Sequence, residues 1–150
     1  MAFEKTLHVS WNHLDANGHM ANTAYLDMAV DVRFLYFTSC GFSPAEFLAS
    51  GIGPVVRRDE VDYYRELRML QPVRVNLLLA GLSEDASRFR LVNEFRREDG
   101  ELCARLTSQG GWLDIKARRL VVPPEKLKGA LLGLDRTEAW QQLDSSIKPR

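Results

Sequence analysis

The amino-acid sequence predicts an α+β fold: an antiparallel sheet curled around one long, buried helix, with a short helical segment after the last strand. Two observations carry this prediction. Residues 23–40 have apolar side chains around most of a helical circumference, and four later segments alternate with the period of β-strands. A helix that is apolar on nearly all sides cannot lie exposed on a flat sheet, so the sheet must curl about it.

The opening residues predict a strand, a loop and the start of this helix. Alternation over residues 6–11 predicts a first strand that ends at Trp11. Residues 12–21 are rich in Asn, Asp and Gly and predict a loop. Asn22 suits the N-cap of the helix, and Gly41 suits the C′ position that ends it.

The second half of the chain predicts a run of strands and then helices. Strands are expected over residues 55–66, 73–79, 88–96 and 102–113. Asp99-Gly100 predicts a tight hairpin between the last two, and residues 83–86 give a weaker turn signal. The four strands are therefore expected to form an antiparallel meander. Pro123-Pro124 opens a short helix, and a second helical piece is expected over residues 136–143.

Composition limits the function classes. The 150 residues fit one domain, and 20 basic residues balance 20 acidic ones, so no net charge recruits nucleic acid or anionic lipid. The two cysteines form no disulfide framework, and residues 1–6 carry no apolar secretion signal, so a cytoplasmic protein is expected. Charges at Asp27, Asp31 and Arg33 interrupt the apolar helix, so no membrane span is expected.

The loop of residues 15–22 is the most informative stretch for function. Asp15 shares it with Gly18 and His19, and the loop leads directly into a helix start, where unpaired backbone N–H groups gather. A carboxylate beside free amide donors suits attack on a carbonyl or its hydration. The alternative is that Asp15 only bonds the N–H groups of its own turn.

The histidines of the chain, His8, His13 and His19, all lie near this loop. Their spacing matches no zinc motif and no cysteine joins them, so no metal site is expected. His19 is a candidate for orienting the loop or polarising a substrate carbonyl. The alternative is that it only bonds the backbone.

The order of strand, buried helix and four strands looks like the hotdog fold. The motif Asp15-Ala-Asn-Gly-His-Met-x-Asn22-x-x-Tyr25-Leu26, with Arg33 further along the helix, resembles the acyl-CoA thioesterases of the 4-hydroxybenzoyl-CoA thioesterase type. Residues 53–58 and 118–123 are also similar to later strands of that family. The resemblance covers residues 5–127, and the loop motif is its distinctive part.

The resemblance implies hydrolysis of an acyl or aroyl thioester to a carboxylic acid and coenzyme A, without a cofactor. It assigns Asp15 as the nucleophile or general base, Gly18 as the residue that fixes the turn, and the backbone N–H of about Asn22 as an oxyanion donor. The sequence departs from the family twice. His13 replaces the first acid of an Asp-x-Asp pattern, and Val30 stands where the helix often carries an acid.

Other residues are candidates for binding the substrate. Tyr25 and Tyr63 are candidates for lining an acyl pocket, as is Tyr64, with core packing as the alternative. Arginine binds phosphate oxygens through its planar fork. The candidates for the coenzyme A phosphates are Arg57, Arg58 and Arg65, and the alternative is that they are solvated strand positions.

Two further functions remain open at this point. One is a non-catalytic acyl-CoA-binding module with the same fold. The other is a hydroxyacyl-thioester dehydratase, which needs a histidine–carboxylate pair; on the long helix, only Asp27 or Asp31 offers His19 an acid. A homodimer or homotetramer is expected, because the active loop of a single chain would lie open to water.

Overall fold

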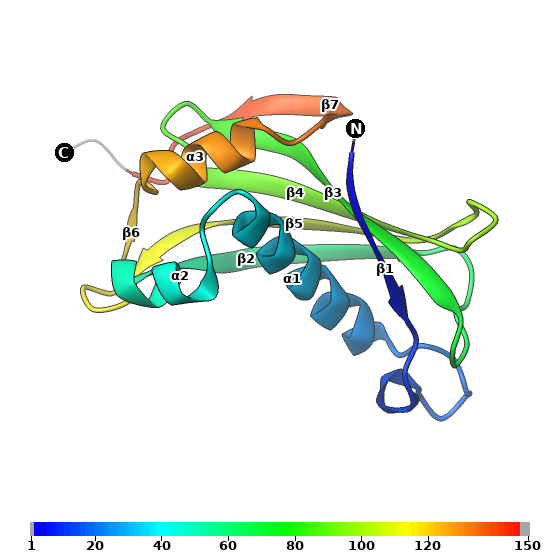
Figure 1. Ribbon diagram of the computed structural model, residues 1–150. Helices are drawn as coiled ribbons and strands as arrows, with labels where there is room; N and C mark the ends of the chain where they lie inside the picture. Colours follow the sequence, from blue (N-terminus) through cyan, green and yellow to red (C-terminus); the bar gives the residue numbers. More distant parts are fainter. Residues whose placement is uncertain (1, 148–150) are drawn as a thin grey trace.

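The computed structural model describes residues 2–147, and Figure 1 shows a strongly bent sheet with α1 packed against one of its faces. The elements are β1 (Phe3–His8), η1 (Trp11–His13), α1 (Asn22–Ser39), α2 (Pro44–Ser50), β2 (Ile52–Tyr63), β3 (Pro72–Ser83), β4 (Arg88–Arg96), β5 (Leu102–Asp114), β6 (Arg119–Val121), α3 (Glu125–Leu132) and β7 (Arg136–Leu143). The expected α+β architecture, a curled antiparallel sheet around one long helix, is confirmed.

The strand order corrects the predicted meander. The order along the sheet is β1-β3-β4-β5-β2, so β3, β4 and β5 form the expected meander while β2 pairs with β5 at the far edge. The connection between β2 and β3 is not a tight turn. Residues 64–71 cross the end of the sheet and contact the loop before α1, where the Met20 N–H donates to the Leu67 carbonyl at 2.7 Å.

The first strand also differs from its prediction. It ends at His8, because its partner β3 begins opposite it at Pro72. Trp11 therefore lies in the short helical turn η1, where it is 79% exposed.

The predicted helix over residues 136–143 is wrong. These residues form β7, a strand that runs parallel to β3. Thr137, Trp140 and Leu143 are its half-buried residues, and their spacing of three is what mimics a helix in the sequence. The structure instead uses the hydrogen-bonding groups of β3 beyond the end of β1, so tertiary pairing overrides the local pattern.

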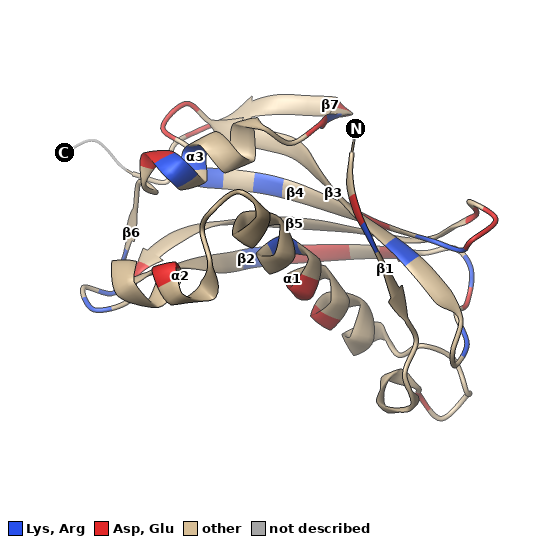
Figure 2. Ribbon diagram, in the orientation of Figure 1, with Lys and Arg blue, Asp and Glu red and all other residues tan. Residues whose placement is uncertain are grey.

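Helix α1 buries one face and leaves another uncovered. Its buried residues are Ala24, Tyr25, Met28, Ala29, Val32, Arg33, Tyr36 and Phe37. Its outer side carries Asp27 and Asp31, seen as acidic positions in Figure 2, and also exposes Val30 and Leu35. The chain alone therefore does not wrap the helix on all sides, contrary to the expectation from its apolar circumference.

The predicted end of α1 is confirmed, and its predicted start is off by one residue. Gly41 follows the helix with φ of +87°, as expected for the C′ position. The N-cap is Ala21 and not Asn22, which is the first helical residue. Within residues 2–147, no helix combines the length and hydropathy needed to cross a bilayer.

Candidate active site

The loop before α1 is closed around the Asp15 carboxylate. Its Oδ1 atom accepts hydrogen bonds from the backbone N–H groups of Asn17, at 2.8 Å, and His19, at 3.2 Å. The backbone N–H of Asp15 donates to the His19 carbonyl, and Gly18 turns the chain with φ of +75°. One oxygen of Asp15 therefore bonds the N–H groups of its own turn, which is the alternative role considered for this residue. Within the described residues, Oδ2 accepts no hydrogen bond.

The loop delivers this carboxylate to the amino end of α1. The Ala21 N–H is bonded to the His13 carbonyl, and the Ala24 N–H to the Ala21 carbonyl. The N–H groups of Asn22 and Thr23 have no hydrogen-bond partner among residues 2–147. Unpaired N–H groups at a helix start favour negative charge, as the oxyanion prediction for Asn22 requires.

One hollow brings together most of the predicted site residues. It has a volume of about 310 Å³ and lies where β2 ends. Its lining residues are Asp15, His19, Met20, Tyr25, Tyr63, Tyr64, Arg65 and Glu66. Gly18 belongs to the same loop without lining the hollow, and Asn22 is the exposed first residue of α1 and does not line it either.

Tyr25 joins the hollow to the core. Its side chain is 2% exposed and packs edge-on against the rings of Tyr63 and Phe95, each with a centroid distance of 5.2 Å. Burial raises the pKa of Tyr25 to about 12, with smaller contributions from the neighbouring Cys103 and Tyr63. The phenol is therefore neutral at physiological pH and keeps its proton as a hydrogen-bond donor.

Glu66 is a residue of this hollow that the sequence analysis missed. One carboxylate oxygen lies 3.0 Å from His19 Nε2, and the other accepts a hydrogen bond from Arg68 at 2.8 Å. The hydrogen bond from Arg68 holds the pKa of Glu66 below its usual value. In the sequence, Glu66 is one acid in a run of charged residues. Nothing in that run indicates that it contacts the loop of His19, which lies much earlier in the chain.

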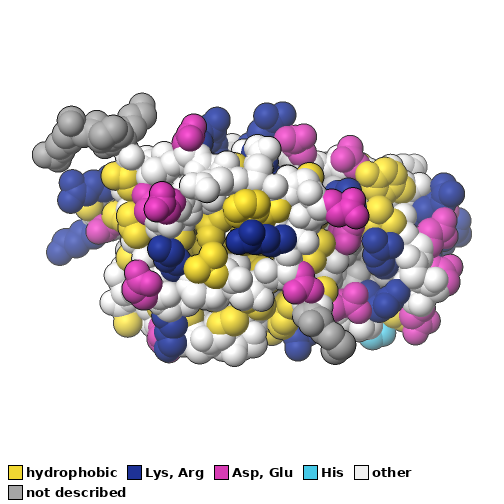
Figure 3. Space-filling model, turned by 90° about the horizontal axis from the view of Figure 1, so that it is seen from above, with side chains coloured by type: hydrophobic (Ala, Val, Ile, Leu, Met, Phe, Trp, Pro, Cys, Tyr) yellow, Lys and Arg dark blue, Asp and Glu magenta, His cyan; other side chains and the backbone are white. Residues whose placement is uncertain are grey.

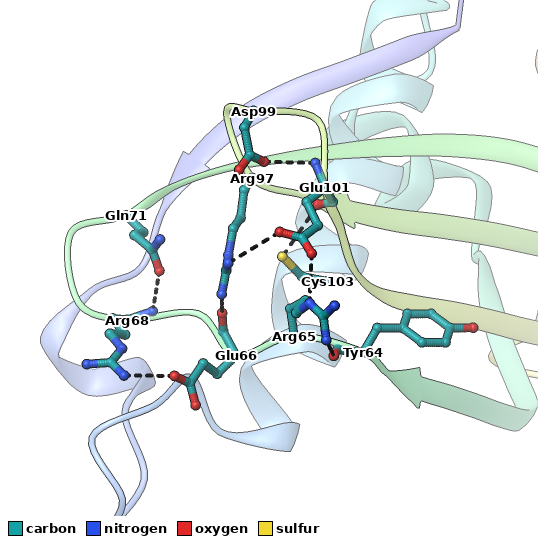
Figure 4. A network of polar contacts seen from close by, with 9 residues as sticks. All are labelled: Tyr64, Arg65, Glu66, Arg68, Gln71, Arg97, Asp99, Glu101 and Cys103. Atoms are coloured by element: carbon teal, nitrogen blue, oxygen red, sulfur yellow. Dashed lines mark hydrogen bonds and ion pairs between the residues drawn. The ribbon is translucent and has the colours of Figure 1, made fainter.

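Arg65 lies at the rim of the hollow with its charge already matched. Its Nε atom is 2.7 Å from a carboxylate oxygen of Glu101, on the hairpin between β4 and β5. Figure 4 shows this pair beside Arg97, which contacts Glu101 and donates to the backbone carbonyl of Glu66. The predicted phosphate role of Arg65 would have to compete with this ion pair.

Arg57 and Arg58 lie outside the hollow. Both stand at the β-bulge in the middle of β2, where the register against β5 shifts. Arg58 pairs with Glu60 at 3.2 Å, and Arg57 lines a separate hollow of about 140 Å³ together with Arg88. Within the described chain they are not brought together with Asp15.

A larger hollow of about 470 Å³ lies on the outer face of the sheet. The view from above in Figure 3 shows a basic side chain lying among hydrophobic ones near the centre of the molecule. No histidine and no helix start borders this hollow, and its inner acid, Glu94, is bonded to Arg105 and Asn76. The hollow beside Asp15 is therefore the better candidate site. No cluster of three or more metal-ligating side chains occurs within residues 2–147.

Comparison with known proteins gives both a family and a relative. A family model described as "Thioesterase-like superfamily" matches residues 9–131. Among curated proteins, the L-carnitine dehydrogenase/betainyl-CoA thioesterase of Agrobacterium fabrum is 29% identical over 131 residues, which make up 87% of this chain. They make up 26% of the relative, so the chain spans about a quarter of that protein's length.

Solved structures share the fold at lower identity. A hypothetical protein of Staphylococcus aureus, solved in complex with CoA, has a TM-score of 0.81 and 22% identity, over 94% of this chain and 90% of the other. The 1,4-dihydroxy-2-naphthoyl-CoA thioesterase of Synechocystis has a TM-score of 0.79 and 19% identity, over 91% of this chain and 100% of the other. These likenesses confirm the expected hotdog fold.

Proposed function

Because the chain belongs to the thioesterase-like superfamily, we propose that it hydrolyses the thioester of an acyl-CoA to a carboxylic acid and coenzyme A. The observation that carries the proposal is the state of Asp15. One of its oxygens is held by two backbone N–H groups, and the other accepts no hydrogen bond from residues 2–147 and lies beside a hollow at the start of α1. A fixed carboxylate with one available oxygen is suited to attack or to general-base catalysis.

The chemistry has two routes from this carboxylate. In the first, Asp15 takes a proton from water while the water oxygen bonds to the thioester carbon, and the C–S bond then breaks to release the coenzyme A thiolate. In the second, Asp15 attacks the carbon itself, the C–S bond breaks to release the coenzyme A thiolate, and water then cleaves the resulting anhydride. In both, the unpaired N–H groups of Asn22 and Thr23 stabilise the developing oxyanion. A thiolate leaves readily, so one carboxylate suffices.

Under single-turnover conditions, isotopically labelled water separates general-base catalysis from direct attack in which water opens the anhydride at the Asp15 carbonyl. Direct attack followed by water addition at Asp15 leaves label in the protein, at the peptide that contains Asp15. General-base catalysis places the label in the carboxylic acid product alone. Peptide mass spectrometry after one turnover reads the difference.

Coenzyme A thioesters are the substrates to test. The relatives are named for betainyl-CoA and 1,4-dihydroxy-2-naphthoyl-CoA, and one structural neighbour was solved with CoA. A panel of short-chain, long-chain, aromatic and betainyl thioesters of coenzyme A therefore includes the acyl groups for which these relatives are named. Arg57, Arg58 and Arg65 remain our candidates for the phosphate groups.

The test is thiol release with matched aspartate variants. Asp15→Asn keeps the Oδ1 acceptor of the turn and removes the carboxylate, so activity should fall by at least about 100-fold with little change in Tm. Asp27→Asn, at an exposed position of α1, should leave activity unchanged. The proposal is wrong if no thioester of the panel releases thiol, or if Asp15→Asn retains full activity.

We also propose that two copies pair through the outer edge of β2. This strand lies at one end of the sheet and has no neighbour on its outer side within the described residues. Tyr63, at the end of β2, is 51% exposed beside the hollow, so a paired copy would shelter the site from water. The pairing yields a homodimer, and two such dimers a homotetramer.

One structural observation favours a second candidate function. The pair of His19 and Glu66 supplies the histidine–carboxylate arrangement that a hydroxyacyl-thioester dehydratase needs, with an acid from outside the helix. Loss of water from a 3-hydroxyacyl-CoA would be seen as enoyl absorbance without thiol release. Recovery of intact thioester after prolonged incubation, with binding measured by calorimetry, would instead indicate the non-catalytic acyl-CoA-binding module.

A further inference from the structure

We infer that Glu66 is a positioning residue for the reaction: it fixes the Asp15 carboxylate by holding the imidazole of His19. The inference rests on the proposed function, because it assigns Glu66 to the same site. It differs from the dehydratase alternative in that Glu66 acts through His19 and touches no reacting atom.

The contacts form a continuous path from Glu66 to Asp15. Glu66 Oε2 lies 3.0 Å from His19 Nε2. The backbone of His19 makes two hydrogen bonds to Asp15, since its N–H donates to Oδ1 at 3.2 Å and its carbonyl accepts from the Asp15 N–H at 2.8 Å. The side chain of His19 thus anchors the same residue whose backbone orients the carboxylate.

Glu66 is itself held from two directions, as Figure 4 shows. Arg68 donates to its second carboxylate oxygen at 2.8 Å, and Arg97 donates to its backbone carbonyl. Arg97 also contacts Glu101 at 3.6 Å across the β4–β5 hairpin. Two segments besides its own therefore meet at Glu66, the loop before α1 and the β4–β5 hairpin, and Arg68 of its own connection holds the carboxylate in place.

A loop on the surface needs such an anchor. Asp15 and Glu66 are both exposed, so no packing of apolar groups fixes the carboxylate in place. The remaining link between the loop and the β2–β3 connection is the Met20 N–H to Leu67 carbonyl bond, together with the bridge of His19 to Arg68. Loss of the Glu66 charge should leave these backbone bonds intact while the His19 side chain is released.

The expected consequence is a defect in the chemical step. A small misplacement of a reacting group lowers the rate strongly while substrate binding is retained. Glu66→Gln should therefore lower kcat by about 10-fold with KM changed by less than about 3-fold. Glu46→Gln is the matched control, because Glu46 is a similarly exposed acid in an ion pair with Lys126 and lies in α2, which follows the end of α1 opposite the loop.

A double-mutant cycle tests the path through His19. His19→Gln removes the imidazole, so Glu66→Gln should have no further effect on kcat in that background. Additive effects of the two substitutions would overturn the inference, as would a kcat of Glu66→Gln equal to that of Glu46→Gln.

Hydrogen exchange gives a readout that does not depend on activity. Backbone amides of residues 15–19 should exchange faster in Glu66→Gln than in the wild-type protein, and Glu46→Gln should leave them unchanged. Unchanged exchange in Glu66→Gln would overturn the inference. A wild-type protein that hydrolyses no thioester would overturn the proposed function alone, and the exchange experiment would still decide whether Glu66 fixes the loop.

Discussion

The guanidinium of Arg33 lies inside the fold with its Nη2 atom 3.0 Å from Oδ1 of Asn93. Arg33 is 7% exposed, and the same nitrogen also donates to Ser108 Oγ, which donates in turn to Asp59. Burial lowers the pKa of Arg33 to about 10, although Asp59 opposes the change. The arginine stays charged at physiological pH and links α1 to the strands that the helix covers.

Replacing this arginine should destabilise the protein strongly. Arg33→Met fills a similar volume but leaves the buried Asn93 oxygen and the Ser108 hydroxyl without their donor. We expect the free energy of unfolding to fall by about 3 kcal/mol, measured by urea denaturation. Arg119→Met is the control, because Arg119 is exposed and forms no ion pair within the described residues. Equal stability of the two variants would contradict a structural role for the Arg33 network.

The fold could be predicted where its signals are local. The span of α1 follows from its apolar pattern, and the β4–β5 hairpin follows from Asp99-Gly100. The position of β2 could not be predicted, because its pairing with β5 joins segments far apart in sequence. The strand β7 resembles a helix in the sequence, because Thr137, Trp140 and Leu143 recur every three residues. Such a spacing is typical of one face of a helix.

The residues of the candidate site also divide into those that a local motif identifies and those that only the tertiary structure brings together. Asp15, His19 and Tyr25 lie within one short stretch of sequence, so a single motif identifies them together. Glu66 and Tyr63 reach the hollow only because the chain crosses the end of the sheet after β2. Nothing in the residues around Glu66 encodes that crossing, and so the partner of His19 could not be found without the structure.

Two glycine substitutions should have opposite effects on stability. At Gly110, an added Cβ would lie 2.0 Å from the backbone carbonyl oxygen of Val55, across the β-bulge of β2, where neither backbone can give way. At Gly129, within α3, an added Cβ meets nothing within 4 Å. Gly110→Ala should therefore cost at least about 3 kcal/mol, and Gly129→Ala should raise Tm by about 2 °C. Thermal unfolding of both variants checks the pair, and a neutral Gly110→Ala would disprove the close approach of β2 to β5.

Acid should weaken the attachment of the segment that follows β7. Burial would raise the pKa of Asp85, but hydrogen bonds from Ser145, Ser87 and Ser83 outweigh it and hold the pKa well below its usual value. A carboxyl whose pKa is depressed by folding contributes stability above its unfolded-state pKa of about 4, and this contribution is lost as the pH falls toward the folded-state pKa.

The unfolding free energy should therefore fall between about pH 5 and pH 2, with a shallower slope in Asp85→Asn. Asp62→Asn, at an exposed acid that accepts no side-chain hydrogen bond among residues 2–147, should keep the wild-type slope. Identical slopes in all three proteins would show that the serine cluster around Asp85 does not hold its charge.

The proposed pairing of β2 edges makes one side of α1 an interface. Val30 precedes Arg33 by three residues, so the two lie on the same side of the helix, where Arg33 donates to Ser108 of β5 and Ser108 donates to Asp59 of β2. Leu35 lies on the opposite flank, and the two apolar side chains are almost equally exposed, at 42% and 43%. Val30→Glu should weaken self-association by at least about 10-fold, because a charge would be buried, whereas Leu35→Glu should leave it unchanged. Light scattering over a concentration series measures both. A monomeric wild-type protein would refute the pairing, and so would an oligomer that Leu35→Glu dissociates and Val30→Glu does not.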